Sequence, residues 1–461
     1  MANRVAVILV VGLDERLIAH APRIRAFANA GRVTTLRPTL PAVTCSAQAS
    51  MLTGLPPREH GVVGNGWFNR EQNEVQFWKQ SNALVSGEKV WETARRRDPS
   101  VTCANLFWWF NMYSSVDVSV TPRPIYKADG RKIPDIYTQP ANWRDELQER
   151  LGRFPLFQFW GPGASIASSK WITEAALLTR QRFDPTLSLI YLPHLDYPLQ
   201  KYGPDAPCIP AEVAAVDALV GRLLDDCAET GARPIIVSEY AIEAVSRPVA
   251  LNRVLRGEGW LRVREEDGGE LLDAGASDAF AVVDHQVAHV YVRQAELVQR
   301  VSDRLSREPG VARVLDRAAQ REYGIDHDRA GELVAIAEPG AWFCYPYWED
   351  DRRAPDFART VDIHRKPGYD PCELFLDPRI RFPKAAIGWR LLKRKLGMRT
   401  LMDVIPLDPG LVKGTHGHVD TAAGNRPVMI TDTGVTVGTS DSTNTAPSED
   451  VRGTILQAMR L

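Results

Sequence analysis

The segment from Pro41 to Asn65 contains the residues whose types and spacing best suit chemistry. In it, Thr44 precedes a run with helical character, and a Thr-Gly pair at Thr53 and a His-Gly pair lead on to Asn65. A hydroxyl at a helix N-terminus faces free N–H groups and the positive end of the helix dipole, which suits an incoming phosphate. A metal ion there would lower the hydroxyl pKa and generate an alkoxide nucleophile. The simpler alternative is that Thr44 only caps the helix.

Three further segments carry polar residues where ligands would gather. They are Asp196-Tyr-Pro-Leu-Gln-Lys-Tyr-Gly-Pro204, Ser238-Glu-Tyr-Ala-Ile242 and Gly414-Thr-His-Gly417. The first two follow apolar runs that read as buried strands, and ligands bind outside the carboxyl ends of parallel strands. The first two segments are therefore expected to lie at one edge of a parallel sheet.

Together the four segments resemble the type I phosphodiesterase/nucleotide pyrophosphatase family of the alkaline-phosphatase superfamily. The resemblance covers residues 1–260 and 410–435. It implies that Thr44 is the nucleophile and that Asn65 holds a phosphoryl oxygen. It also implies a divalent metal, zinc with manganese or iron as alternatives, bound by Asp196, Glu239 and His416.

The chain departs from the family pattern at three expected ligand positions. These positions hold Val11, Gln200 and Tyr240 in place of one Asp and two His. Gln is a poor zinc ligand, and Val cannot coordinate at all. His194 could partly substitute if the strand before Asp196 continues, since the two would then share a face. It could equally be a turn histidine bonded to backbone.

Two other histidine groups are candidates to supply the missing ligands. His285 and His289 lie in a strand-like run, Phe280–Val292, where they would share one strand face. The loop 362–370 contains His364 with Arg365 and Lys366, two cations that could bind a substrate phosphate. The alternatives are a chance spacing for the first group and a loop held by internal salt bridges for the second.

The elements that must position these residues form an α/β pattern. Apolar runs at Val5–Val11, Leu187–Leu192 and Pro234–Ser238 predict buried strands. Helical periodicity is found over Arg16–Ala30, Ile172–Arg182 and Ala211–Thr230. The alternation predicts an alkaline-phosphatase-like core with a mostly parallel sheet and helices on both faces.

The character of the sequence changes after about residue 260. We expect a catalytic core from residues 1–260 and 410–461, with an inserted cap subdomain over 261–409 that includes a basic helix at Trp389–Arg399. The tail Thr431–Asn444 is rich in Thr, Ser, Gly and Asp, which predicts a loop.

Composition narrows the class of partner. Lys plus Arg (56) nearly balance Asp plus Glu (57), so the net charge gives no indication of a surface that binds nucleic acid or membrane. The six scattered cysteines favour a reducing cytoplasm. The apolar run near the N-terminus is too short to span a membrane and is not followed by a cleavage site. A small phosphate ester is the expected partner, and the oligomeric state is open.

We therefore expect a metal-dependent hydrolase of a phosphodiester, pyrophosphate or phosphomonoester that uses Thr44 as nucleophile. A second possibility is a catalytically degenerate binding protein that keeps the fold without the two metals. Phosphoryl or sulfuryl transfer between small molecules would use the same parts.

Overall fold

The computed structural model describes residues 2–419, 424–435, 437 and 444–461. In these residues the largest sheet has nine strands in the order β23-β2-β22-β11-β1-β10-β5-β6-β9. The strands are β1 (Val5–Val10), β2 (Arg32–Arg37), β5 (Cys103–Leu106), β6 (Val118–Pro122), β9 (Ile136–Gln139), β10 (Leu187–Leu192), β11 (Arg233–Val237), β22 (Val428–Thr431) and β23 (Thr445–Pro447).

The centre of this sheet is parallel. The strand β1 pairs in parallel with both β10 and β11, and β10, β5 and β6 continue the parallel set. Every residue of β1 and β10 is buried, as expected for strands that are covered on both faces. The three apolar runs therefore form adjacent strands, and the predicted mixed α/β fold is confirmed.

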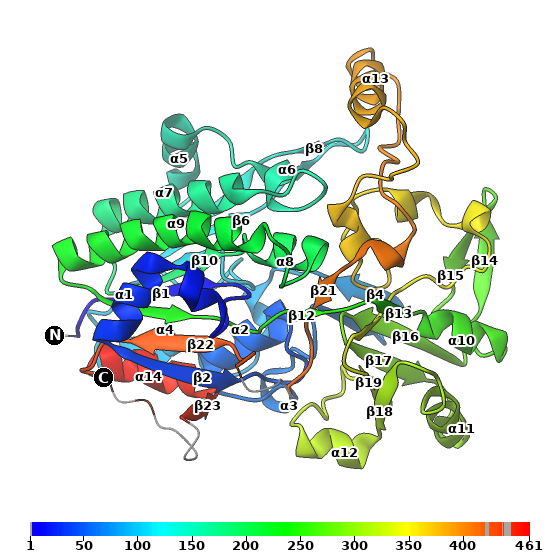
Figure 1. Cartoon of the computed structure of the whole chain (residues 1–461), viewed down its shortest axis with the longest axis horizontal. Helices are drawn as coiled ribbons and strands as arrows, with labels where there is room; N and C mark the ends of the chain where they lie inside the picture. The colour runs from blue at the N-terminus through cyan, green and yellow to red at the C-terminus, as the bar shows by residue number, and fades with distance from the viewer. Residues whose placement is uncertain (1, 420–423, 436, 438–443) are drawn as a thin grey trace.

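Helices cover both faces of the sheet (Figure 1). On one side, α1 (Pro22–Ala30) and α7 (Ile166–Phe183) pack against α9 (Ile209–Thr230). On the other side, α2 (Thr44–Thr53) and α4 (Val90–Arg97) pack against α14 (Asp450–Ala458). The prediction of a single helix over residues 16–30 is wrong in one respect. A 3₁₀ turn at Leu17–His20 ends before Pro22, which starts α1 because proline has no N–H to donate inside a helix.

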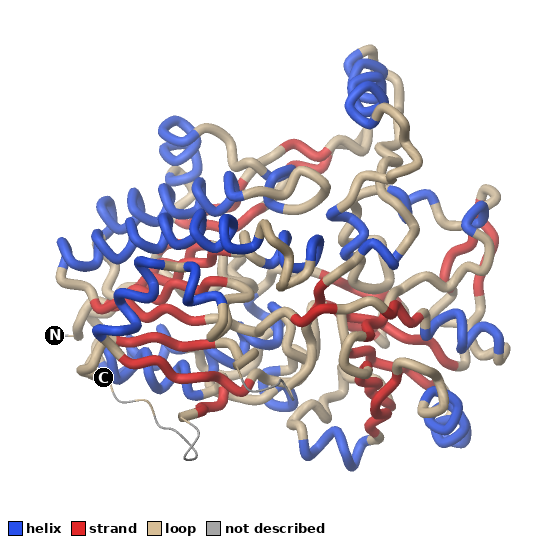
Figure 2. The backbone as a smooth tube through the Cα atoms, in the orientation of Figure 1, coloured by secondary structure: helices blue, strands red, loops and turns tan. Residues whose placement is uncertain are grey.

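A second, antiparallel sheet lies beside the first and is separate from it (Figure 2). Its strands run in the order β16 (Ala279–Asp284), β17 (Val287–Val292), β19 (Leu333–Ala337) and β18 (Val311–Leu315). Its apolar cluster also takes in Phe68 and Phe77 of the hairpin β3–β4 (Gly66–Asn69 and Glu74–Phe77) and Leu251 of α10 (Leu251–Gly257). The boundaries 261–409 stay a prediction, and contacts of this unit reach beyond them.

The run Phe280–Val292 is two strands rather than one, which corrects the expectation that His285 and His289 share a strand face. His285 lies in the tight turn between β16 and β17 with φ +61°. The turn reverses the chain, so only His289 lies in a strand.

The C-terminal region is described in part. The expected loop 431–444 begins at the last residue of β22, and residues 436 and 438–443 of it lie outside the described residues. The predicted basic helix is α13 (Pro383–Lys395), slightly earlier in the chain than expected.

Candidate active site

The carboxyl ends of three adjacent parallel strands create the site. The strand β1 leads to Val11, β10 leads to Asp196 at the start of α8 (Asp196–Tyr202), and β11 leads to Glu239 and Tyr240. Because these strands are neighbours and parallel, the residues that follow them meet at one edge of the sheet.

Thr44 is the first residue of α2 and is buried. The cap position is Val43, whose side chain accepts no hydrogen bond from the helix, so Thr44 is not the N-cap. Its hydroxyl instead lies 3.1 Å from the Tyr240 hydroxyl. The side chain therefore faces the polar cluster rather than its own backbone.

Tyr240 connects Thr44 to Asp196. The Tyr240 hydroxyl donates to Asp196 Oδ1 at 3.3 Å. A phenol has a single hydrogen, so Thr44 must be the donor in its own bond to Tyr240. The hydrogen bonds then run in one direction, from Thr44 through Tyr240 to the carboxylate of Asp196.

Gln200 takes the other oxygen of Asp196. Its Nε2 donates to Asp196 Oδ2 at 2.7 Å, and its Oε1 accepts from the Tyr369 hydroxyl at 2.9 Å. Burial raises the pKa of Asp196 to about 7, against the hydrogen bonds from Gln200 and Tyr240. Two of the residues that replaced expected metal ligands thus bind Asp196 themselves.

Glu239 is fully buried beside Thr44 and Tyr240. Gln48 Nε2, one turn after Thr44 on α2, donates to Glu239 Oε2 at 3.0 Å. The other oxygen, Oε1, is buried and has no hydrogen-bond partner among the residues that the structure describes. Burial is the main cause that raises the pKa of Glu239 to about 8. Gln48 was not selected from the sequence, although its spacing of four residues from Thr44 places both on one helix face.

His416 follows β21 (Gly414–Thr415) and closes the cluster. Its Nδ1 lies 2.7 Å from the carbonyl oxygen of Ala42, and its Nε2 lies 3.8 Å from Asp196 Oδ1. Because the ring is buried, its pKa is lowered to about 3, so the imidazole is neutral. The ring stacks on Tyr240, with centroids 3.5 Å apart.

His285 is the one histidine of the two additional groups that joins the site. Its ring centroid lies 3.6 Å from that of His416 and 3.8 Å from that of Tyr369. Its Nδ1 lies 3.0 Å from Thr415 Oγ1. His285 lies in the turn at the end of β16, so its ring reaches the site from the second sheet.

Asn65 lies next to the start of α2 and is fixed by Asp284. Its Oδ1 accepts from the Cys45 N–H at 3.0 Å, which satisfies one free donor of the helix. Its backbone N–H and its Nδ2 donate to the two oxygens of Asp284, at 2.7 and 3.1 Å. Asp284 lies in the run Phe280–Val292 but was not selected from the sequence, because nothing local links it to residue 65.

The structure does not bring His289, His364 or His194 into the cluster. His289 is bonded on both ring nitrogens, to the Val63 carbonyl at 2.8 Å and the Gly331 N–H at 3.2 Å. His364 is exposed, with its Nδ1 3.1 Å from the Phe77 carbonyl. His194 pairs with Glu212 at 2.6 Å, because β10 ends at Leu192 and the expected strand face does not continue.

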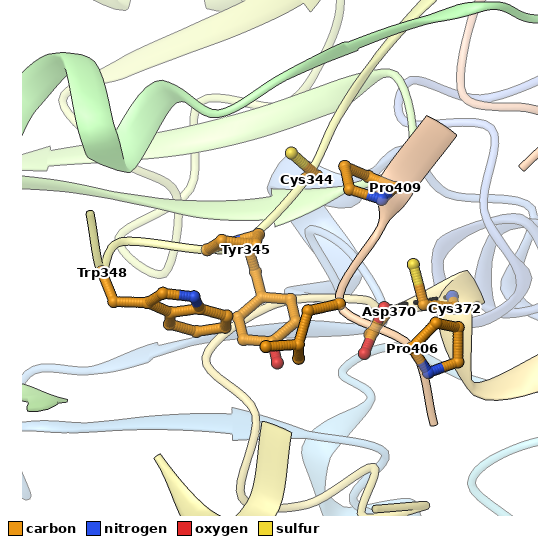
Figure 3. A pocket seen from close by; sticks show the side chains of 9 residues that line it. Cys344, Tyr345, Trp348, Asp370, Cys372, Pro406 and Pro409 are labelled. Atoms are coloured by element: carbon orange, nitrogen blue, oxygen red, sulfur yellow. Dashed lines mark hydrogen bonds between the residues drawn. The ribbon is translucent and has the colours of Figure 1, made fainter. Parts of the chain in front are cut away.

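The two candidate phosphate-binding cations are also placed elsewhere. Arg365 is exposed and pairs with Asp356 at 2.9 Å. Lys366 is fully buried between Asp370 and Glu373, at 2.6 and 2.7 Å, so its charge is already balanced. Asp370 lines a small cavity with Tyr345 and Cys372 (Figure 3). The ion pairs of Arg365 and Lys366 correct the expectation that these two cations bind the substrate phosphate.

The donor set does not fit a pair of metal ions. Val11 is buried and apolar, and Gln200 and Tyr240 occupy the oxygens of Asp196. Across the residues that the structure describes, no group of three or more His, Cys, Asp or Glu side chains is arranged to hold a metal. The Tyr240 hydroxyl lies between Thr44 and Asp196 and bonds to both side chains.

The fold, a mostly parallel sheet with a helix-terminal threonine and two carboxylates at its carboxyl edge, is alkaline-phosphatase-like. The profile of the type I phosphodiesterase/nucleotide pyrophosphatase family matches residues 5–370. The chain therefore belongs to that family, a family of phosphoric ester hydrolases whose members generally depend on divalent metals.

Curated relatives match part of the chain. Ectonucleotide pyrophosphatase/phosphodiesterase family member 1 of Mus musculus is 26% identical over 245 residues, which is 51% of this chain and 23% of the relative. An uncharacterised pyrophosphatase/phosphodiesterase of Schizosaccharomyces pombe is 24% identical over 204 residues, 42% of this chain and 34% of the relative. The matches thus span about a third or less of these relatives.

Solved structures share the fold. Phosphonoacetate hydrolase from Sinorhizobium meliloti, in complex with phosphonoformate, has a TM-score of 0.62 at 14% identity and covers 99% of this chain and 96% of its own. An inactive form of murine ectonucleotide pyrophosphatase/phosphodiesterase 5, in complex with AMP, has a TM-score of 0.58 at 14% identity and covers 100% and 95%.

Proposed function

We propose that this chain hydrolyses a small phosphoric ester, a phosphodiester, pyrophosphate or phosphomonoester, with Thr44 as the nucleophile. The observation that carries the proposal is the directed hydrogen-bond chain from Thr44 through Tyr240 to Asp196 at the N-terminus of α2. Family membership supports the reaction class, and the AMP and phosphonoformate in the related structures support a small phosphorus-containing substrate.

The hydrogen-bond chain supplies the proton acceptor for the first step. As Thr44 Oγ1 bonds to phosphorus, its proton passes to Tyr240 and the Tyr240 proton passes to Asp196. A pKa of about 7 suits Asp196 to accept a proton near neutral pH. Glu239, with a pKa of about 8, retains its proton there and can give it to the leaving oxygen.

The second step releases the product. Water attacks the phosphothreonine and loses its proton to Glu239, while Thr44 leaves and recovers its proton from Asp196 through Tyr240. In this proposal the negative charge on the phosphoryl oxygens is stabilised by the N-terminus of α2 and by Asn65 Nδ2, which donates only one of its two hydrogens to Asp284. These steps use side chains of the described site, and the metal expected from the resemblance has no part in them because the donor set does not fit it.

A second function is favoured by a specific observation. The Tyr240 ring and hydroxyl fill the centre of the cluster, and Thr44, Asp196 and His416 are all buried. Such a site suits a catalytically degenerate protein that binds a phosphate ester without turning it over.

Turnover and covalent trapping separate these two functions. The chain would be incubated with a nitrophenyl phosphodiester, a nitrophenyl phosphomonoester and a nucleoside triphosphate, quenched in acid, and analysed by peptide mass spectrometry. The hydrolase gives product and an adduct on Thr44. Thr44→Ala should lose about three orders of magnitude or more in rate with a stability change of about 1 kcal/mol, and Thr44→Ser should keep part of the activity.

The remaining outcomes are equally informative. AMP binding by calorimetry without product or adduct would support the binding protein. Full activity in Thr44→Ala would exclude the covalent mechanism. A chain that showed no AMP binding and no turnover would exclude both functions.

A further inference from the structure

Helix α13 projects from the body of the molecule at the end of two long connecting segments (Figure 1). It has no buried residue, although the chain around it is rich in apolar side chains. One side of the helix is held in place. Ile387 packs against the cluster that contains Val404 and Ile405, and Arg390 Nε donates to Asp403 Oδ1 at 2.7 Å.

The opposite side of α13 is an exposed apolar stripe. Trp389, Leu392 and Leu396 follow one another at spacings of three and four residues, so they share one face, which Phe382 extends at the start of the helix. Phe382 is 66% exposed, Trp389 57% and Leu396 66%. Large apolar side chains gathered in this way on a projecting element usually mark an interaction site.

The stripe lies within a strongly basic segment. Residues 378–402 contain no Asp or Glu, and their cations are Arg379, Arg381, Lys384, Arg390, Lys393, Arg394, Lys395 and Arg399. Arg379 and Arg390 pair with flanking Asp377 and Asp403. Among the described residues, the other six have no carboxylate within ion-pair distance, so the apolar stripe is flanked by uncompensated positive charge.

We propose that α13 docks this protein on the surface of an anionic lipid bilayer. A helix with Trp, Phe and Leu on one side and Lys and Arg around it lies in the interface, with its rings among the headgroups and its cations on the lipid phosphates. The Lys393 ammonium lies 5.3 Å from the Trp389 ring centroid, which places a cation at the edge of the apolar stripe.

The positive charge around α13 favours an anionic bilayer over a second copy of the chain as the partner of this helix. Two copies that met through α13 would bring the same cations together, whereas an anionic surface complements them. A nucleic acid would use the cations but would leave the exposed leucines in water. Among the described residues, no helix is long and apolar enough to span a membrane, so the contact would be peripheral.

Vesicle sedimentation of the full chain tests the proposal. At near-physiological salt, the chain should sediment with vesicles of equal parts phosphatidylcholine and phosphatidylglycerol and not with phosphatidylcholine alone. The Trp389→Ser/Leu392→Ser variant should reduce the partition coefficient by about tenfold or more. Lys393→Ala and Lys395→Ala should each reduce it about fivefold. The matched control is Phe157→Ser on α6 (Leu156–Phe159), where a side chain 60% exposed should not affect binding.

Several results would overturn the proposal. They are no binding to the mixed vesicles, equal loss in Phe157→Ser, or binding that the Trp389→Ser/Leu392→Ser variant leaves unchanged. Heparin binding with the same affinity in that variant, together with no vesicle binding, would point to a soluble polyanion. A dimer in light scattering that this variant abolishes would point to a second copy. Unchanged circular dichroism and melting temperature would show that the variants fold.

Discussion

The ring of Tyr240 lies flat on the ring of His416, with 3.5 Å between the centroids and 7° between the planes. The stack covers one face of the His416 imidazole, whose Nε2 lies 3.8 Å from Asp196 Oδ1. The same tyrosine bonds Thr44 and Asp196 through its hydroxyl. One side chain therefore joins Thr44, which we propose as the nucleophile, to a carboxylate and to the histidine.

Metal content follows from this arrangement. After dialysis against zinc, manganese or iron, the parent chain is expected to retain less than one metal per chain. The combined Val11→Asp, Gln200→His and Tyr240→His variant restores three donors, so added zinc should raise its melting temperature in proportion to binding. Tyr240→Phe, which keeps the stack, is the control and should gain no metal. A stoichiometric metal in the parent, measured by elemental analysis, would refute the expectation.

Glu239 should make stability depend on pH. Its pKa is about 8 in the fold against an ordinary value of 4.5, so the fold favours the protonated form. Its contribution is fully present below pH 4.5 and is lost as the pH rises to about 8. In the presence of a chelator, the parent should lose up to about 5 kcal/mol of unfolding free energy relative to Glu239→Gln across this window. Denaturant melts that show a constant difference would contradict the assignment.

Lys366 and Arg365 offer a matched pair of neighbours. Lys366→Met leaves two carboxylates buried without their cation, which should lower the unfolding free energy by about 3–5 kcal/mol. Arg365→Met removes an exposed ion pair and should change it by less than about 1 kcal/mol. If Lys366→Met instead kept its stability and lost affinity for AMP, the lysine would be a substrate ligand after all.

Alanine variants of three histidines should behave differently. His285→Ala removes a ring that touches His416 and Tyr369, so turnover or AMP affinity should fall. His289→Ala leaves the Val63 carbonyl and Gly331 N–H without partners, which should cost about 1–3 kcal/mol of stability. His364→Ala, at an exposed residue, should affect neither activity nor stability. Equal activity and stability in all three variants would show that these contacts have no consequence.

Local sequence patterns determined the framework of this protein. The apolar runs fixed β1, β10 and β11 because buried parallel strands need apolar side chains on both faces. The order of strand and helix then required the residues after these strands to meet at one edge. Asp196 and Glu239 follow two of these strands, but the resemblance to the family is what selected them together with Thr44, and the structure brings the three side chains together. The break at Pro22 was also readable from the sequence, although the helix was predicted to run through it.

Only the tertiary structure decided how the site is completed. The sequence shows Tyr240 as the loss of a ligand, whereas its bonds to Thr44 and Asp196 and its stack on His416 depend on packing between distant segments. Lys366 is buried in an ion pair whereas Arg365 is exposed. The sequence does not show this difference, because adjacent residues in a loop can point into the core or into water. The sequence predicted a basic helix near residues 389–399, but only the structure shows that its apolar side chains are exposed, because a local pattern does not tell which face of a helix packs against the rest of the chain.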